Sequence, residues 1–227
     1  MTQSETVDPA PPVKPRLRGV LHQWASVAAA GAVVALVAMA PSGRSALAAG
    51  VFGLSLVTLF AVSATYHRVH WSARWRAVMR RLDHASIFVL IAGTYTPIAA
   101  LGLPVRVGDP LLRLVWAAAL AGVAQSVLWI RAPKAVAAAL ALAMGWTIVP
   151  YLPEVRRALP AAVFALVAAG GVVYSLGAVA YATKRPDPRP VVFGYHEVFH
   201  ACTLVGAALH FAAVVLLTRA APVGLRA

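Results

Sequence analysis

The chain has 227 residues, of which 61% are hydrophobic and only 12% are charged. This composition excludes a disordered chain, which needs low hydrophobicity, and argues against an ordinary soluble domain, which carries about twice this share of charge. In a soluble protein, the net charge of +13 would suggest nucleic acid binding. Here the cations lie almost entirely between long apolar runs, so the composition indicates a polytopic membrane protein that binds no nucleic acid.

Seven apolar segments are long enough to cross a bilayer, whose hydrocarbon core needs roughly 20 apolar residues per helix. In chain order they are Leu21–Ala40, Ser45–His70, Leu82–Leu103, Pro110–Ile130, Lys134–Leu152, Pro160–Thr183 and Gly194–Thr218. We therefore predict an all-α membrane protein, a seven-transmembrane helix bundle. Residues 21–218 form its one domain, between an N-terminal tail of residues 1–20, predicted to be disordered, and a short tail of residues 219–227.

Proline, glycine or charged residues separate these segments, and two of the separating stretches matter below. The first runs from Arg74 to Arg81 and is rich in arginine. The second is Pro153–Pro160, which follows the fifth segment. Both stretches are predicted to interrupt the helices that cross the membrane.

The distribution of Lys and Arg predicts how the bundle lies in the membrane. With seven spans, the N-terminal tail shares a side with the loops after spans two, four and six, and this side holds 13 cations against 7 on the other. Because positively charged loops stay in the cytoplasm, we predict a multi-pass protein of the inner (plasma) membrane, with a cytoplasmic N-terminus and an extracytoplasmic C-terminus. A signal peptide cleaved near Ala46-Leu47-Ala48 is the alternative, but its removal would spoil this asymmetry.

Histidines and an acid gather where the second, third and seventh segments reach the predicted cytoplasmic side. His67 lies near the end of the second, Asp83 at the start of the third, and His196 and His200 early in the seventh. Ionisable groups inside spans are expensive and usually functional. His196 and His200 are four residues apart and share a helix face, so with His67 they offer three nitrogen ligands to one metal ion. Three ligands leave a fourth tetrahedral position open, as in catalytic zinc sites, and we predict bound Zn²⁺.

Two further residues are predicted to act in the chemistry at that metal. We assign Asp83 the role of holding a water molecule there or taking its proton. Ser63 lies one turn before His67 on the same helix face. We assign it the role of orienting an imidazole.

Residues 196–200 read His-Glu-Val-Phe-His and match the H-E-x-x-H pattern of zinc proteases, in which Glu197 would be the general base. Taken alone, this five-residue match is weak. The alternative is a carboxylate at the cytoplasmic rim that faces another direction, roughly 100° round the helix from His196.

Three other histidines are predicted to lie outside the metal site. His210 is roughly 21 Å along the helix axis from His196, too far to share an ion, so it either makes a hydrogen bond inside the bundle or touches a ligand. His84 neighbours Asp83 and is expected to point elsewhere. His22 is expected at the membrane interface.

Several motifs on these segments resemble those of one known family. Residues 63–67 are similar to its Ser-x-x-x-His motif, residues 82–84 with 91–97 to its third-span signature, and residues 196–200 with 210–211 to its last-span signature. The motifs, their order and the seven spans resemble the hemolysin III family, the bacterial branch of the progestin and adipoQ receptor (PAQR) superfamily. The resemblance covers nearly the whole chain.

The resemblance implies a seven-helix bundle with its N-terminus inside. It also implies zinc bound by His67, His196 and His200, with Asp83 contacting the metal-bound water. The wider superfamily includes alkaline ceramidases and adiponectin receptors, which implies a site like that of an amide hydrolase. The hemolysin name implies a channel-forming or cytolytic role. Glu197 departs from the animal receptors, which do not rely on an acid at that place.

Four hypotheses for function follow. The first is a zinc-dependent hydrolase that acts on a lipid amide or ester and serves membrane homeostasis, with membrane lipids as partners and as the source of its substrate. The second is a receptor or sensor in which zinc is structural. The third is a channel or cytolytic protein, and the fourth an intramembrane protease that uses Glu197. The sequence leaves the substrate, the choice among transition metals and the oligomeric state open.

Overall fold

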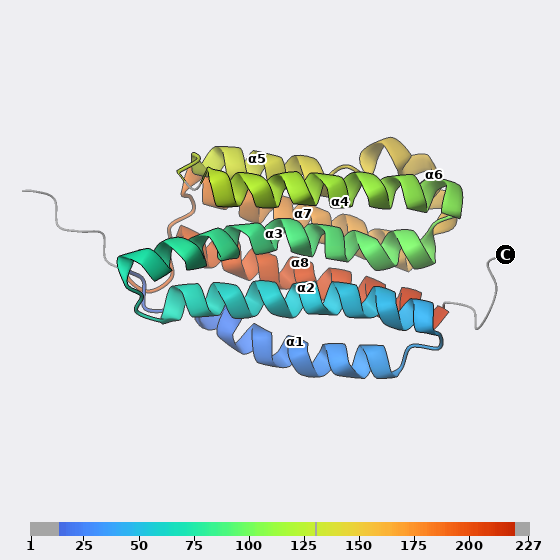
Figure 1. Ribbon diagram of the computed structural model, residues 1–227, viewed down its shortest axis with the longest axis horizontal. Coiled ribbons are helices and arrows are strands. Elements are labelled where there is room, and N and C mark those ends of the chain that lie inside the picture. Colours follow the sequence, from blue (N-terminus) through green and yellow to red (C-terminus); the bar gives the residue numbers. More distant parts are fainter. Residues whose placement is uncertain (1–13, 130, 221–227) are drawn as a thin grey trace, which may run out of the picture.

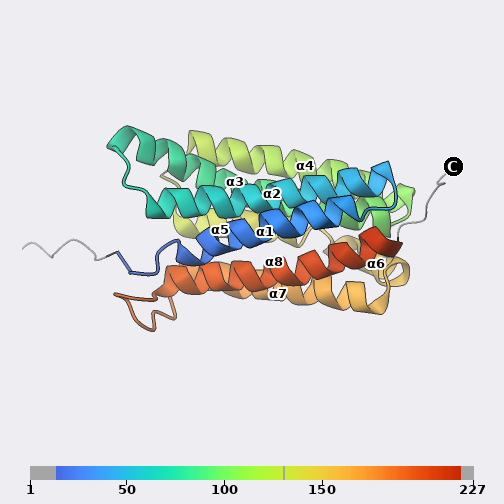
Figure 2. The same cartoon turned by 90° about the horizontal axis from the view of Figure 1, so that it is seen from below.

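A computed structural model describes residues 14–129 and 131–220, and within these residues it is helical, without a β-strand. The helices are α1 (Val20–Ala38), α2 (Gly43–Arg68), α3 (Ala73–Gly102), α4 (Val105–Leu128), α5 (Lys134–Gly145), the short 3-10 helix η1 (Val149–Tyr151), α6 (Leu152–Ala158), α7 (Ala161–Thr183) and α8 (Tyr195–Ala220). The long helices run side by side along the longest axis of the molecule (Figures 1 and 2).

Seven stretches of this helical chain are long and apolar enough to cross a membrane, the fifth being Ala135–Ala158. Their outer faces carry large apolar side chains, and the exposed fractions of Val34, Leu47 and Leu120 are 70%, 71% and 70%. Such exposure is unfavourable in water but suits contact with lipid chains. The predicted fold class, an all-α seven-transmembrane bundle, is confirmed.

The arginine-rich stretch Arg74–Arg81 is helical and belongs to α3, which begins at Ala73, so the prediction of an interruption there was wrong. Between Ala73 and Ala92 the chain contains neither proline nor glycine. Arginine is among the better helix formers, so charge alone does not end a helix. The result is a third helix of 30 residues that projects beyond its apolar part.

The fifth span is broken where a single helix was predicted. α5 ends at Gly145, η1 covers Val149–Tyr151, and α6 carries the helix on to Ala158. Pro150 and Pro153 account for the break, because proline has no backbone N–H to donate within a helix. Proline is tolerated in the first turn, which is why α6 begins one residue before Pro153.

The order of packing brings the predicted site together. α1 packs against α2, α2 against α3, α3 against α4 and α7 against α8, while α8 also contacts α1, α2 and α3. The end of α2 and the starts of α1, α3 and α8 therefore meet at one end of the bundle, opposite to the end where α8 finishes (Figures 1 and 2). The charge asymmetry predicts that this end is cytoplasmic.

Glycines let α7 and α8 approach closely along their antiparallel contact. A Cβ atom at Gly170 would lie 2.4 Å from the ring of His210, and one at Gly206 would lie 2.7 Å from the ring of Tyr174. Small residues allow this kind of approach in membrane helices. Each glycine thus makes room for one ring of the facing helix.

Before α1, residues Lys14–Gly19 form a segment that we call the N-terminal strap. The backbone N–H groups of Arg16 and Leu17 donate to the carbonyls of Val191 and Val192, at 2.9 and 3.1 Å. This part of the predicted tail therefore lies against the connection that leads into α8. Residues 1–13 of the tail, and the C-terminal residues 221–227, lie outside the described residues.

Candidate metal centre

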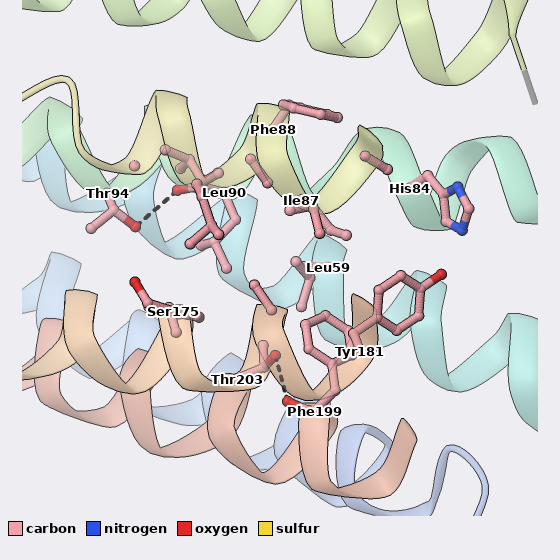
Figure 3. A pocket seen from close by; sticks show the side chains of 18 of the residues that line it. Leu59, His84, Ile87, Phe88, Leu90, Thr94, Ser175, Tyr181, Phe199 and Thr203 are labelled. Carbon is pink, nitrogen blue, oxygen red and sulfur yellow. Dashed lines mark hydrogen bonds between the residues drawn. The ribbon is translucent and has the colours of Figure 1, made fainter. Parts of the chain in front are cut away.

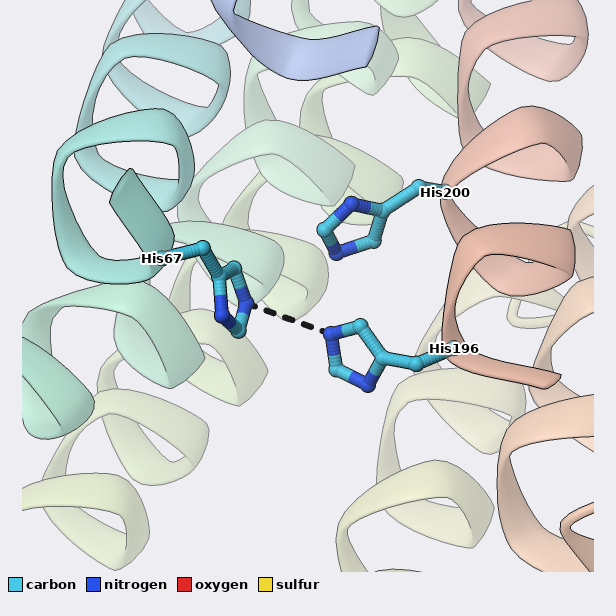
Figure 4. A group of neighbouring side chains, drawn as sticks. All are labelled: His67, His196 and His200. Atoms are coloured by element: carbon cyan, nitrogen blue, oxygen red, sulfur yellow. Dashed lines mark hydrogen bonds between the residues drawn. The ribbon is translucent and has the colours of Figure 1, made fainter. Parts of the chain in front are cut away.

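Three histidine rings from two helices meet at the end of the bundle that holds the N-terminal strap (Figure 4). His67 comes from the last turn of α2, and His196 and His200 come from the first two turns of α8. Their exposed fractions are 8%, 8% and 2%. One nitrogen atom from each ring lies within 4.8 Å of the others, and Nε2 of His196 is 3.2 Å from Nε2 of His67.

The start of α8 is fixed by two acids, so the rings of its first turns have a rigid base. A carboxylate oxygen of Asp187 accepts the backbone N–H of Tyr195 at 2.8 Å. Oε2 of Glu197 accepts the backbone N–H of Gly194 at 2.9 Å. The first N–H groups of a helix lack partners within it and carry partial positive charge, so carboxylates stabilise this end.

These nitrogens fit a transition metal. Zinc binds imidazole nitrogen at about 2.0–2.1 Å in tetrahedral geometry, which places two such ligands about 3.3 Å apart. The 3.2 Å separation of the His67 and His196 nitrogens matches that spacing. In addition, Nδ1 of His200 is buried and has no hydrogen-bond partner among the described residues. The cluster could hold a metal ion, as its sequence spacing predicts.

Asp83 and Ser63 lie beside the cluster, towards the inside of the bundle. The Oδ2 atom of Asp83 is 4.0 Å from Nε2 of His67, and 13% of the Asp83 side chain is exposed. Ser63 is buried, and its side chain makes a hydrogen bond with that of Asp83, while its predicted role of orienting an imidazole stays a prediction. α3 and α2 thus place a carboxyl group next to the histidines, oriented by a hydroxyl group.

Glu197 lies next to His196 in the sequence but turns away from the cluster. Its exposed fraction is 1%, and its Oε1 atom accepts a charged hydrogen bond of 2.5 Å from Nε of Arg18 in the strap. Its other oxygen accepts the N–H of Gly194. Both oxygens therefore bond to groups outside the histidine cluster, which disfavours Glu197 as the general base of a zinc protease.

The strap also lies against the histidine of α2. Gly19 has a φ of 80°, and a Cβ atom at this position would lie 2.7 Å from Cβ of His67. The ammonium group of Lys14 donates to the backbone carbonyl of His67. Partial burial lowers the pKa of Lys14 first, and repulsion from Arg18, Arg76 and Arg68 lowers it further. The strap therefore carries concentrated positive charge across this side of the cluster.

The prediction that His22 lies at the membrane interface was wrong. Its exposed fraction is 2%, and its ring stacks on that of His200, with centroids 3.8 Å apart and planes inclined by 13°. The sequence shows only a histidine in the first turn of an apolar helix. Its stacking on His200 depends on the packing of α1 against α8, which the sequence does not reveal. His84 also differs from expectation, because it lines the same cavity as Asp83.

A cavity with a volume of about 170 Å³ extends from the histidines into the bundle between α3, α5, α7 and α8. Apolar side chains such as Leu59, Ile87 and Leu90 line much of it (Figure 3). His196, His200 and Asp83 also line it. The candidate metal centre therefore opens onto a largely apolar space between the helices.

The seven apolar helices and the buried polar cluster at one end define a multi-pass integral membrane protein. The model of the haemolysin-III related family matches residues 12–211 of the chain. The hemolysin-3 homolog of Bacillus subtilis (strain 168) is 30% identical over 161 residues, which cover 71% of this chain and 72% of that protein. Hemolysin-3 of Bacillus cereus is 30% identical over 161 residues, covering 71% and 70%.

A plant protein extends the comparison. The heptahelical transmembrane protein ADIPOR2 of Oryza sativa subsp. japonica is 33% identical over 187 residues, which cover 74% of this chain and 80% of that protein. The chain belongs to the hemolysin III family of the PAQR superfamily, and the predicted family is confirmed. Membership places it as a multi-pass protein of the plasma membrane.

Proposed function

We propose that this protein is a zinc-dependent hydrolase that cleaves a lipid amide or ester at the cytoplasmic leaflet of its membrane. The observation that carries the proposal is the set of three buried imidazoles, with nitrogens within 4.8 Å of one another, beside a carboxyl group and at the mouth of an apolar cavity. A structural cation site needs no such cavity.

The donor set supports zinc. Three imidazoles from the protein leave one tetrahedral position open, the arrangement of catalytic zinc sites. A zinc ion held by His67, His196 and His200 would supply Lewis acidity that polarises the carbonyl group of an amide or ester.

The remaining chemistry belongs to Asp83 and Ser63. The carboxyl group of Asp83 lies on the cavity side of His67, where it takes a proton from the attacking water and returns it to the leaving group. The hydroxyl of Ser63 holds that carboxyl group in place. Glu197 takes no part, because Arg18 and Gly194 occupy both of its oxygens.

The cavity supports a lipid as the substrate. Its largely apolar lining suits an acyl chain, and burial of that chain removes apolar surface from water. The charge asymmetry of 13 cations against 7 supports a cytoplasmic site, because the strap end is the cation-rich one.

The first experiment measures metal. Elemental analysis of the purified protein is expected to give one zinc per chain, with zinc lost in His67→Ala and in His200→Ala. His70→Ala is the matched control, because His70 is exposed and lies three residues after His67. Retention of zinc in both site variants would refute the assigned ligands.

The second experiment measures turnover on a panel of lipid amides and esters. We expect hydrolysis by the wild type and none by His67→Ala. If no lipid is consumed while removal of zinc lowers thermal stability, zinc is structural and the receptor or sensor hypothesis holds. Leakage of liposomes that persists in His67→Ala would favour the channel or cytolytic hypothesis.

A further inference from the structure

We infer that the cavity contains a second, polar subsite, formed by His210 of α8 and Tyr174 of α7, which binds a hydroxyl group on the chain of the lipid. The inference rests on the proposed function to the extent that a lipid chain occupies the cavity. It adds a group on the substrate that the metal centre does not contact.

The hydrogen bond of His210 fixes which of its nitrogens carries the proton. Nε2 lies 3.1 Å from the carbonyl oxygen of Val167, and a carbonyl only accepts, so Nε2 is the donor. Among the described residues, carboxylates lie within 4.0 Å of a basic nitrogen at Arg18–Glu197, His67–Asp83 and Arg157–Glu154, so none pairs with His210. In the neutral ring, Nδ1 then carries no proton and can only accept a hydrogen bond.

This acceptor has no partner in the part of the chain that the structure describes. Nδ1 of His210 is buried and makes no hydrogen bond to any described residue, although 91% of the residue is removed from solvent. A buried acceptor left without a donor costs stability, so such atoms need an explanation. Because His210 lines the cavity, a ligand there can supply the missing donor.

Tyr174 supplies the complementary group. It lines the same cavity, its ring centroid lies 5.4 Å from that of His210, and its hydroxyl makes no hydrogen bond within residues 14–129 and 131–220. The ring of Tyr174 packs against Gly206 and the ring of His210 packs against Gly170, so both side chains are confined. The rings that carry the open acceptor and the hydroxyl are thus held next to one another.

Several other hydroxyl groups along the cavity already have partners, and that of Tyr95 donates to the carbonyl of Gly145 on α5. Thr94 donates to the carbonyl of Leu90 and Thr203 to that of Phe199, as Figure 3 shows. Ser175 donates to the carbonyl of Gly171 and accepts the indole N–H of Trp146. These hydroxyl groups are occupied, whereas the one on the Tyr174 ring, next to the His210 ring, is not bonded to a described residue.

These two groups select an alcohol. A ligand hydroxyl can donate to Nδ1 of His210 and accept from the Tyr174 hydroxyl at the same time, whereas a carboxylate or a ketone has no proton to donate. His210 lies ten residues beyond His200, which is about 15 Å along the helix axis. A lipid with its polar end at the histidine cluster would therefore carry this hydroxyl in the middle of its chain.

The test compares two probes on purified, metal-loaded protein in detergent: stearic acid and a hydroxystearic acid with its hydroxyl at mid-chain. Calorimetric titration should show about tenfold tighter binding of the hydroxylated acid, the net size expected for two added hydrogen bonds that replace bonds to water. Tyr174→Phe and His210→Phe should each abolish this preference. Tyr151→Phe, a tyrosine outside the cavity lining, should keep it.

Each result decides the inference. Equal affinities in the wild type would show that water alone fills the subsite and would overturn the inference, while leaving lipid binding and the proposed hydrolase intact. A preference that survives in both Tyr174→Phe and His210→Phe would also overturn it. If neither acid binds, the inference fails together with the lipid-binding cavity, whereas zinc content and turnover on the lipid panel test the hydrolase separately.

Discussion

The two sides of the histidine cluster hold one acid each, and the contacts of these acids differ. On the cavity side, Asp83 contacts Ser63 and His67 and faces an apolar space. On the strap side, Glu197 is almost fully buried and both of its oxygens are occupied, by Arg18 and by Gly194. The comparison teaches that closeness to a metal site in the sequence does not make an acid available for chemistry. The groups that its carboxylate faces decide this instead.

The strongest test of this difference is Asp83→Asn. The amide has the size of the carboxyl group but cannot take a proton, so we expect lipid turnover to fall by about 10²–10⁴. Zinc content should stay at the wild-type value, because Asp83 is not one of the three ligands. Asp109→Asn, at an exposed acid elsewhere in the chain, is the control. Loss of zinc together with activity would instead make Asp83 a ligand.

Glu197→Gln tests the other side. Glu197 is buried and Arg18 is partly buried, so loss of the charge on Glu197 leaves Arg18 without its partner, and we expect the free energy of unfolding to fall by about 2 kcal/mol. Thermal unfolding in detergent measures this loss. Turnover by the folded fraction should remain within about tenfold of the wild type. A zinc-protease arrangement predicts the reverse, which is abolished turnover with unchanged stability.

These contrasts also show how much of the candidate site could be predicted from the sequence. The spacing of His196 and His200 places both rings on one helix face, and the seven apolar segments bring α2 and α8 together at one end, so the three-histidine cluster could be predicted. Asp83 was predicted from its depth in the membrane, which follows from the same segments. Helix periodicity and span length carry this information, because both are local properties of the chain.

What the sequence did not reveal depends on contacts between distant segments. Arg18 and Glu197 are 179 residues apart, so nothing local indicates that the strap neutralises the acid of the H-E-x-x-H pattern. The stack of His22 on His200 likewise requires α1 to pack against α8. The prediction for Arg74–Arg81 failed for another reason. A run of charged residues was interpreted as the end of a helix, but it marks only the end of the apolar part of α3.

Ser63→Ala gives a smaller effect on the cavity side. Without the hydroxyl, the Asp83 carboxyl group loses the hydrogen bond that orients it, so we expect turnover to fall by about tenfold, the equivalent of one hydrogen bond. Zinc content should not change. Ser86→Ala is a suitable control, because its hydroxyl is bonded to the backbone carbonyl of Asp83 and not to the carboxyl group. Equal losses in the two variants would show general destabilisation of the α2–α3 packing instead.

Lys14→Met gives the smallest effect and tests the charge of the strap through its pH dependence. Burial and the neighbouring arginines lower the pKa of Lys14, so its charged form is disfavoured in the folded protein. That penalty is fully present below the folded-state pKa, and it is relieved as the pH rises through that value towards the usual 10.5. The wild type should therefore gain thermal stability relative to Lys14→Met over this alkaline range, by less than about 1 kcal/mol, because the side chain remains largely exposed. A difference between the two proteins that does not change with pH would mean that Lys14 acts through its hydrogen bond to the His67 carbonyl alone, and that the positive charge of the strap has no energetic consequence.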